Sequence, residues 1–163
     1  MGKFIIGLII FIAAVIVSLY FGAIKIYNYS SENIDLQVWV EPVNVSLSDG
    51  TFTISCKIEN LTGKPVEFDG FFTTTGPHLG WCSWTGNKPK LMLEKPDGVE
   101  ISLIVYNKLD NSGASRSLDI LPEEGLQGKG TYSAQDLNLV PGDYIIAFVL
   151  MGKTRETRFT ISE

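Results

Sequence analysis

The chain has 163 residues, a formal net charge of −5, a single histidine and two cysteines. Net negative charge without a basic stretch excludes nucleic acid as an expected partner. One histidine also excludes a blue-copper centre and any other metal site that needs two histidines from one chain.

The first predicted element is an uncharged apolar stretch of 21 residues, from Phe4 to Ile24. A helix of that length spans about 30 Å, the thickness of the hydrocarbon core of a bilayer. We therefore predict that residues 1–27 form an N-terminal membrane anchor, with residues 4–24 in contact with lipid. The alternative is a cleaved secretory signal, but its apolar region is usually about 7 to 15 residues long, and Phe21 stands where its cleavage site wants a small residue.

The orientation of this anchor is not set by charge, because Lys3 and Lys25 flank it on either side. Acceptor triplets for N-glycosylation begin at three asparagines, Asn28, Asn44 and Asn60. Together with the two cysteines, these triplets favour an oxidising exterior. We predict a cytoplasmic N-terminus in the cell membrane, a polar linker over residues 28–33, and an extracytoplasmic domain over residues 34–163.

The domain reads as short strands separated by turn signals. In the run from Thr51 to Glu59, apolar and polar residues alternate, as a half-buried antiparallel strand requires. The predicted strands in chain order are Asp35 to Val40, Thr51 to Glu59, Leu91 to Glu94, Val99 to Tyr106, Ser115 to Leu121, Gly130 to Ala134, Tyr144 to Met151 and Thr157 to Ile161. The run from Tyr144 to Met151 is apolar on both faces, which predicts a central strand. This pattern predicts an all-β, immunoglobulin-like Greek-key sandwich preceded by one transmembrane α-helix.

Two motifs carry a resemblance that fits this fold. The segment LVPGDY, residues 139–144, resembles the turn before the penultimate strand of immunoglobulin-like and fibronectin-type domains. That resemblance implies a structural role for Tyr144, with its ring in the core and its hydroxyl bonded to nearby backbone. The segment IENLTGKPV, residues 58–66, resembles a strand crossing in envelope-associated sandwiches, of which some are adhesive modules and others are protease inhibitors.

The two cysteines, Cys56 and Cys82, predict a disulfide that ties a long loop to the sandwich. The alternative is a pair of buried free thiols. A nucleophilic Cys82 assisted by His78 is disfavoured, because no orienting third group or hydrolase signature surrounds it.

The stretch between Gly70 and Lys90 is crowded with aromatic side chains and reads as a long loop. One interpretation is core packing over the disulfide. The other is an exposed recognition surface, since large rings bury much area at interfaces. The candidate partner-binding residues are Phe71, Phe72, His78, Trp81 and Trp84.

Signatures of a serine hydrolase, a phosphate-binding loop or a calcium loop are missing from the sequence. We therefore expect no catalytic site, no cofactor and no bound metal. The expected function is non-enzymatic: an accessory subunit of a membrane or envelope complex that acts by protein–protein contact. The alternatives are a pilin-like filament subunit, and an inhibitor or ligand-binding module that uses the 70–90 loop.

Overall fold

The chain divides into two compact units, Met1–Ser30 and Ser31–Glu163, which are described separately. The computed structural model describes residues 11–13, 15–17, 33–48, 50–68, 70–73, 78–82, 88–106, 118–122 and 124–163. In the first unit the described residues, 11–13 and 15–17, are helical. A helix long and apolar enough to cross a membrane is not found among the described residues. Most of the predicted anchor, and nearly all of the predicted linker, lies outside them.

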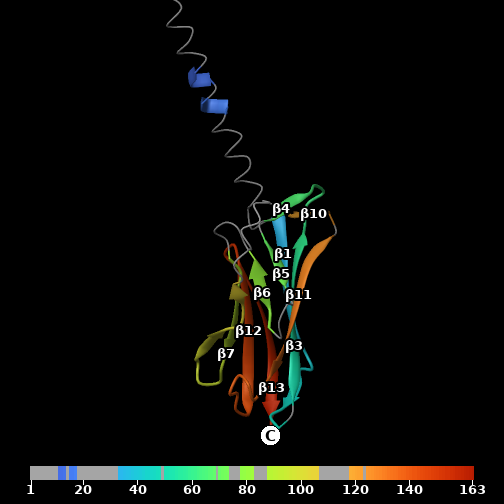
Figure 1. Ribbon diagram of the computed structural model, residues 1–163, viewed down its shortest axis with the longest axis vertical. Coiled ribbons are helices and arrows are strands. Elements are labelled where there is room, and N and C mark those ends of the chain that lie inside the picture. Colours follow the sequence, from blue (N-terminus) through green and yellow to red (C-terminus); the bar gives the residue numbers. More distant parts are fainter. Residues whose placement is uncertain are drawn as a thin grey trace, which may run out of the picture. The chain divides into compact units, whose positions relative to one another are not determined.

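The second unit is built from strands (Figure 1). This confirms the all-β class of the predicted domain. The strands are β1 (Ile34–Glu41), β2 (Asn44–Ser46), β3 (Thr51–Asn60), β4 (Val66–Phe68), β5 (Phe71–Thr73), β6 (Gly80–Cys82), β7 (Lys90–Glu94), β8 (Glu100–Ser102), β9 (Val105–Tyr106), β10 (Leu118–Ile120), β11 (Gly125–Ser133), β12 (Gly142–Leu150) and β13 (Lys153–Ser162).

Two larger sheets form the body of this unit. The first, called the β3 sheet, has the order β1-β3-β11, and the second, called the β12 sheet, has the order β2-β13-β12-β7-β8. The sheets pack against each other through one core, in which the ring of Phe52 on β3 lies 4.7 Å from the ring of Phe159 on β13. Strand β12 is the middle strand of its sheet, which agrees with its predicted central position.

The strand pattern explains how these sheets bury their inner faces. On β3 the side chains of Phe52, Ile54, Cys56 and Ile58 are buried in the core. Lys57 and Glu59 point to the opposite face and are only partly buried. The β12–β13 hairpin closes with two residues, Met151 and Gly152, whose φ angles of 51° and 77° are both positive. Positive φ at both turn positions matches the twist of the flanking strands, so this turn fixes the register of the hairpin.

Two small sheets complete the unit. Strands β10 and β4 pair near one end of it, and β5-β6-β9 form a three-stranded sheet between the larger ones. The sequence missed β2, β4, β5 and β6, because three residues are too few to show an alternating pattern. The expected strand from Val99 to Tyr106 is divided into β8 and β9 by the buried pair Leu103 and Ile104.

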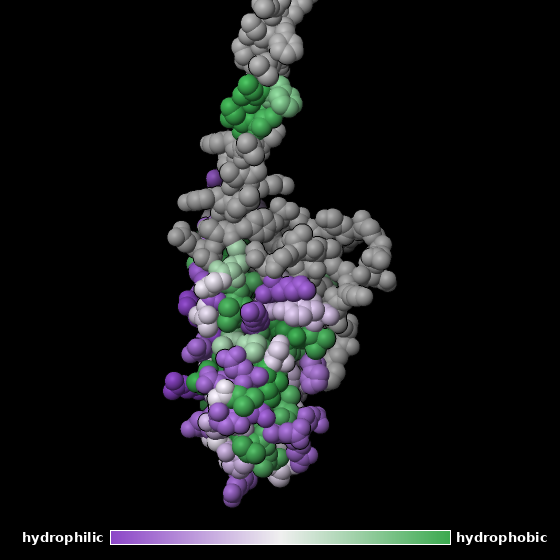
Figure 2. Space-filling view, turned by 90° about the vertical axis from the view of Figure 1, so that its left-hand side faces the viewer, coloured by the Kyte–Doolittle hydropathy of each residue, from purple (hydrophilic) through white to green (hydrophobic). Residues whose placement is uncertain are grey.

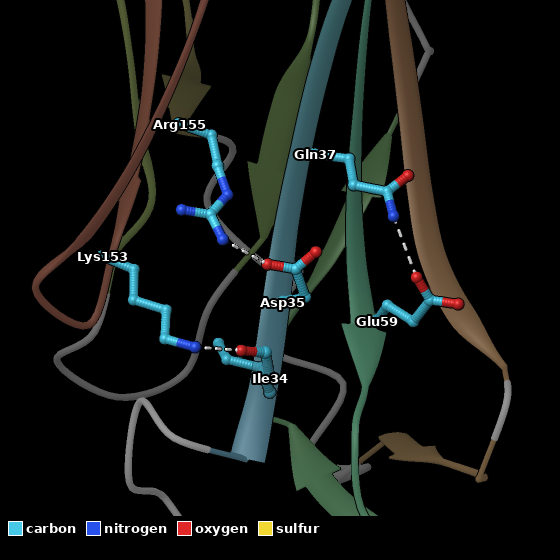
Figure 3. Close-up of polar contacts among 6 residues, drawn as sticks. All are labelled: Ile34, Asp35, Gln37, Glu59, Lys153 and Arg155. Atoms are coloured by element: carbon cyan, nitrogen blue, oxygen red, sulfur yellow. Dashed lines mark hydrogen bonds and ion pairs between the residues drawn. The ribbon is translucent and has the colours of Figure 1, made fainter.

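Polar contacts also join the two large sheets where β1 lies beside β13 (Figure 3). The ammonium group of Lys153 donates to the backbone carbonyl of Ile34. Two residues further along β13, the guanidinium of Arg155 lies 2.8 Å from the carboxylate of Asp35, the residue after Ile34. Both basic side chains therefore reach from β13 to the outer strand of the neighbouring sheet.

Candidate interaction surface

The aromatic stretch contributes to the core. Trp81 on β6 has no exposed surface, and its ring meets that of Phe72 on β5 edge-on at 4.7 Å. Phe72 in turn lies 6.0 Å from Phe148 on β12. Trp81 therefore has no surface to offer a partner, which corrects its place among the partner-binding candidates.

Two glycines on β11 make room for this packing. A Cβ atom at Gly128 would come within 2.3 Å of the Phe72 ring, and one at Gly130 would come within 2.7 Å of the Leu79 amide nitrogen. Contacts this short are impossible for a real side chain, so both positions need glycine for close approach. Strands β5 and β6 are thus structural parts of the sandwich, rather than the long loop that the sequence suggests.

His78 lies at the rim of this packing. Its ring stacks on that of Tyr132 at 5.0 Å and remains partly exposed. The Tyr132 hydroxyl accepts a hydrogen bond from the Leu79 amide and donates one to the Leu103 carbonyl. Burial raises the pKa of Tyr132 to about 12, although the hydrogen bond from Leu79 acts in the opposite direction. His78 thus retains a partly exposed ring whose contact is with the core.

The other aromatic candidates differ in exposure. Phe71 is half-buried, and Phe72 lines a shallow groove of about 420 Å³ together with Gln127 and Lys129. Trp84 lies outside the described residues. The described part of the stretch therefore offers a partner the partly exposed side chains of Phe71, Phe72 and His78.

Cys56 is a free, fully buried thiol. Its cross-strand neighbour is Gly128, and the space over Gly128 is filled by the ring of Phe72. The predicted disulfide with Cys82 is therefore wrong in this structure; the side chain of Cys82 itself lies outside the described part. Burial raises the pKa of Cys56 to about 12, which keeps it a protonated thiol and a poor nucleophile.

The three candidate glycosylation asparagines differ in how the structure describes them. Asn60 is buried, and its amide nitrogen donates to the backbone carbonyls of Lys64 and Ile120 at 2.8 Å and 2.7 Å. A nitrogen engaged in this way cannot carry a glycan in the folded chain, so the structure corrects Asn60 as a candidate. Asn44 is exposed on β2 and keeps its candidacy, whereas Asn28 lies outside the described residues.

Tyr144 lies in the core with no exposed surface. Its hydroxyl donates to the Val140 carbonyl at 2.8 Å and accepts from the Val140 amide at 2.9 Å. These two hydrogen bonds hold the turn that leads into β12. The contacts of Tyr144 are those of a structural residue.

The outer face of the β3 sheet is mostly polar. Gln37 donates to Glu59 at 2.9 Å, and Lys57 forms an ion pair with the same carboxylate at 3.2 Å. Thr53 and Thr131 face each other across the β3–β11 ladder, with their hydroxyls 3.2 Å apart. Apart from the half-buried Trp39, this face carries the polar side chains expected of an antiparallel sheet with one side in water.

The outer face of the β12 sheet is different. Alternate residues of β12 that point away from the core are apolar and partly exposed, as is their neighbour on β7: Ile145, Ala147, Val149 and Met92. We call these four residues the apolar stripe. In Figure 2, which views the molecule from the side where β7 lies in Figure 1, hydrophobic residues run down the middle of the face between hydrophilic flanks. The sequence signal for this stripe is the doubly apolar run from Tyr144 to Met151.

A groove continues the stripe at the end near β2. It has a volume of about 540 Å³, and Ile145, Val43, Arg158 and Asp143 are among its lining residues. Val43 is 56% exposed, so it adds an apolar side chain to this end of the surface. Thr160 donates to the Asp143 carboxylate at 2.8 Å, so that carboxylate is already held within the domain.

Metal chemistry has no support in the described residues, which contain no cluster of three or more His, Cys, Asp or Glu side chains. The apolar stripe with its groove is the candidate interaction surface.

Comparisons with known proteins add little to this description. No protein-family model matches the chain, and no curated protein matches it. Among solved structures, the Northeast Structural Genomics Consortium target SoR45 is 12% identical with a TM-score of 0.35, covering 81% of this chain and 88% of its own. A Bordetella pertussis target, BeR40, described as the "Putative ApaA Protein", is 14% identical with a TM-score of 0.32, covering 77% of this chain and 89% of its own. TM-scores and sequence identities this low carry no argument about fold or function.

Proposed function

We propose that this chain is a non-enzymatic, single-pass membrane protein whose outward-facing β-domain acts by protein–protein contact, as an accessory subunit of a membrane or envelope complex. The observation that carries the proposal is the apolar stripe on the outer face of the β12 sheet.

An antiparallel sheet that packs on a core with one face is expected to present polar residues on the other. The β3 sheet of the same domain follows this rule, with the side chains of Gln37 and Lys57 both bonded to Glu59 on its outer face. The β12 sheet departs from it at Ile145, Ala147 and Val149. A contiguous apolar surface with a polar rim is typical of protein interaction sites. The contrast between the two faces of one domain therefore favours contact through β12.

Two observations support an immunoglobulin-like Greek-key form of the sandwich. The orders β1-β3-β11 and β13-β12-β7 correspond to the orders of strands A, B, E and G, F, C in immunoglobulin domains. The hydrogen bonds between Tyr144 and Val140 correspond to the tyrosine corner of such domains. Support for the membrane anchor comes from the uncharged sequence between Phe4 and Ile24.

The burial of Trp81 bears on the alternative of an inhibitor or ligand-binding module. Trp81 offers such a module no surface, whereas Trp84 lies outside the described residues. The alternative of a pilin-like filament subunit stays a prediction.

The test is co-purification from native membranes in mild detergent, with two variants that each place an arginine on an outward position. Ala147→Arg puts a long charged side chain in the apolar stripe, whereas Thr131→Arg puts the same side chain on the polar face of the β3 sheet. We expect the wild-type chain and Thr131→Arg to retain the same partner chains, and Ala147→Arg to lose them while keeping its melting temperature. Equal retention by all three chains contradicts the proposed surface, and a wild-type chain that is both monomeric and without partner chains contradicts the function.

A further inference from the structure

The charged residues around the apolar stripe are arranged in rows across three strands. In the β7–β12–β13 ladders, Ile145 lies between Glu94 and Arg158. Residues paired in an antiparallel ladder point to the same face, so these three side chains form one row on the outer surface. One flank of the stripe is thus acidic at this level and the other flank is basic.

The next two rows follow the same strands. Ala147 lies between Met92 and Glu156, and Val149 lies between Lys90 and Thr154. The β7 flank therefore runs from acidic at Glu94 to basic at Lys90, and the β13 flank runs from basic at Arg158 to acidic at Glu156.

These flanks are complementary to each other under a particular rotation. When the outer face meets the same face of another copy about a two-fold axis parallel to β12, strand β7 of one copy lies opposite β13 of the other. Each row then meets its own equivalent. Glu94 faces Arg158 of the other copy, and the same pair recurs on the opposite flank. An isologous two-fold contact of this kind satisfies every such pair twice.

The perpendicular two-fold axis fits the charges less well. It places β7 opposite β7 and β13 opposite β13, with the order of rows reversed. Lys90 then meets Glu94, but the two Glu156 carboxylates of the middle row are brought together, and like charges in apposition are unfavourable. The parallel arrangement avoids this contact, because Glu156 of one copy then faces Met92 of the other copy. Lys90 of that other copy lies in the next row.

We propose that the apolar stripe binds the stripe of a second copy of this chain, with the two β12 strands parallel and Glu94 paired with Arg158 across both flanks. The proposal rests on the function proposed above and names the partner of that surface. A parallel pair also points both β1 strands in the same direction, which suits two chains that share the proposed membrane anchor. The apolar side chains supply the area removed from water, and the paired charges set the orientation.

Charge exchange tests the proposal with the full-length chain in mild detergent or in lipid nanodiscs. The variants are Arg158→Glu, Glu94→Arg and the two combined, and the control is Lys129→Glu on the outer face of the β3 sheet. All three positions are exposed in the folded domain, so melting temperatures should stay close to the wild-type value. The measured quantity is the dissociation constant of the dimer, by analytical ultracentrifugation at low and high salt.

We expect each single exchange to raise the dissociation constant about tenfold or more, because it replaces two attractive pairs by two repulsive ones. The combined exchange should restore it to within about threefold, because each pair is re-formed with its signs reversed. Lys129→Glu should leave it unchanged. A combined exchange that fails to restore association overturns the parallel pairing, even if both single exchanges weaken it.

A monomeric wild-type chain also overturns the inference, and the two proposals can then be told apart. If that monomer still binds a different protein, and Ala147→Arg abolishes the binding, the proposed function stands and only the identity of the partner is wrong. If Ala147→Arg changes nothing, both proposals fail.

Orientation has an independent readout. A two-fold axis along β12 places Val149 opposite Val149, whereas the perpendicular axis places it opposite Ile145. Packed sheets lie about 10 Å apart, so a short bismaleimide should link two copies of Val149→Cys. The wild-type chain gives the background from its own cysteines, and Thr131→Cys gives the background from an exposed thiol on the other sheet. A Val149→Cys yield no higher than these controls contradicts the parallel arrangement.

Discussion

Removal of the Trp81 ring is the sharpest test of whether the aromatic stretch is structural. The ring has no exposed surface, and it contacts Phe72 edge-on at 4.7 Å. Trp81→Ala should therefore lower the free energy of unfolding by about 3 to 5 kcal/mol, the usual cost of deleting a large buried aromatic side chain. The free energy of unfolding of a domain of this size is about 5 to 15 kcal/mol. The loss would therefore be a large part of its stability.

The measurement is thermal unfolding of the full-length chain in mild detergent, followed by the circular dichroism of the β-sheet. A loss of this size should lower the melting temperature by at least about 10 °C. The matched control is Trp39→Ala, which removes the same side chain from a half-buried position on the outer face of the β3 sheet. We expect this variant to lose clearly less stability than Trp81→Ala.

The outcome that would refute this reasoning is specific. If Trp81→Ala melts within a few degrees of the wild-type chain but loses a binding partner, Trp81 is a recognition residue and the packing described for β5 and β6 is wrong. If both tryptophan variants lose the same stability, burial is not what distinguishes them.

Four further predictions follow from single contacts. Gly128→Ala should cost about 1 to 3 kcal/mol in thermal unfolding, because a Cβ atom there would overlap the Phe72 ring, whereas Gly63→Ala, with no atom within 4 Å of its Cβ position, should cost much less. Tyr144→Phe should cost about 0.5 to 1.5 kcal/mol by losing both hydrogen bonds to Val140, and an unchanged melting temperature would contradict the role given to that hydroxyl. Asn60→Ala should cost about 1 to 3 kcal/mol, since it leaves the Ile120 carbonyl without its amide donor; equal stability would show that water replaces that donor. Burial raises the pKa of Cys56 from 9.0 to about 12 in the folded chain, so the folded state holds the thiol proton more tightly than the unfolded state does. The contribution of this proton to the free energy of unfolding is fully present below about pH 9 and is lost as the pH rises toward 12. Urea unfolding between pH 9 and 10 should show a decline in the wild-type chain that is weaker in Cys56→Ala, and parallel declines would contradict the assignment to this thiol.

Much of the sheet structure could be predicted because its signals are local. The alternation between Thr51 and Glu59 and the doubly apolar run from Tyr144 to Met151 each depend on a few neighbouring residues. These two features appear in the structure as β3 and the middle strand β12. The LVPGDY segment likewise contains both partners of the Tyr144–Val140 contact.

The site was harder to predict, because its parts come from distant segments. Nothing near Trp81 in the sequence indicates that Gly128 leaves room for its neighbour Phe72. The disulfide was inferred from the number of cysteines, and a count carries no distance. Asn60 matched a glycosylation triplet, yet one of its hydrogen bonds goes to Ile120, sixty residues further along the chain.

The contacts of Lys153 and Arg155 with β1 bear on how this domain behaves at high concentration. A strand at the margin of a sheet presents backbone groups that can pair with another chain, and such pairing leads to open-ended aggregates. Here the Lys153 ammonium already donates a hydrogen bond to the carbonyl of Ile34, and Arg155 is bonded to the side chain of Asp35 beside it (Figure 3). Charged side chains at this margin oppose the addition of a foreign strand. The domain can therefore expose an apolar face while this margin resists growth into fibrils, so at this strand crowding should favour closed assemblies over open ones.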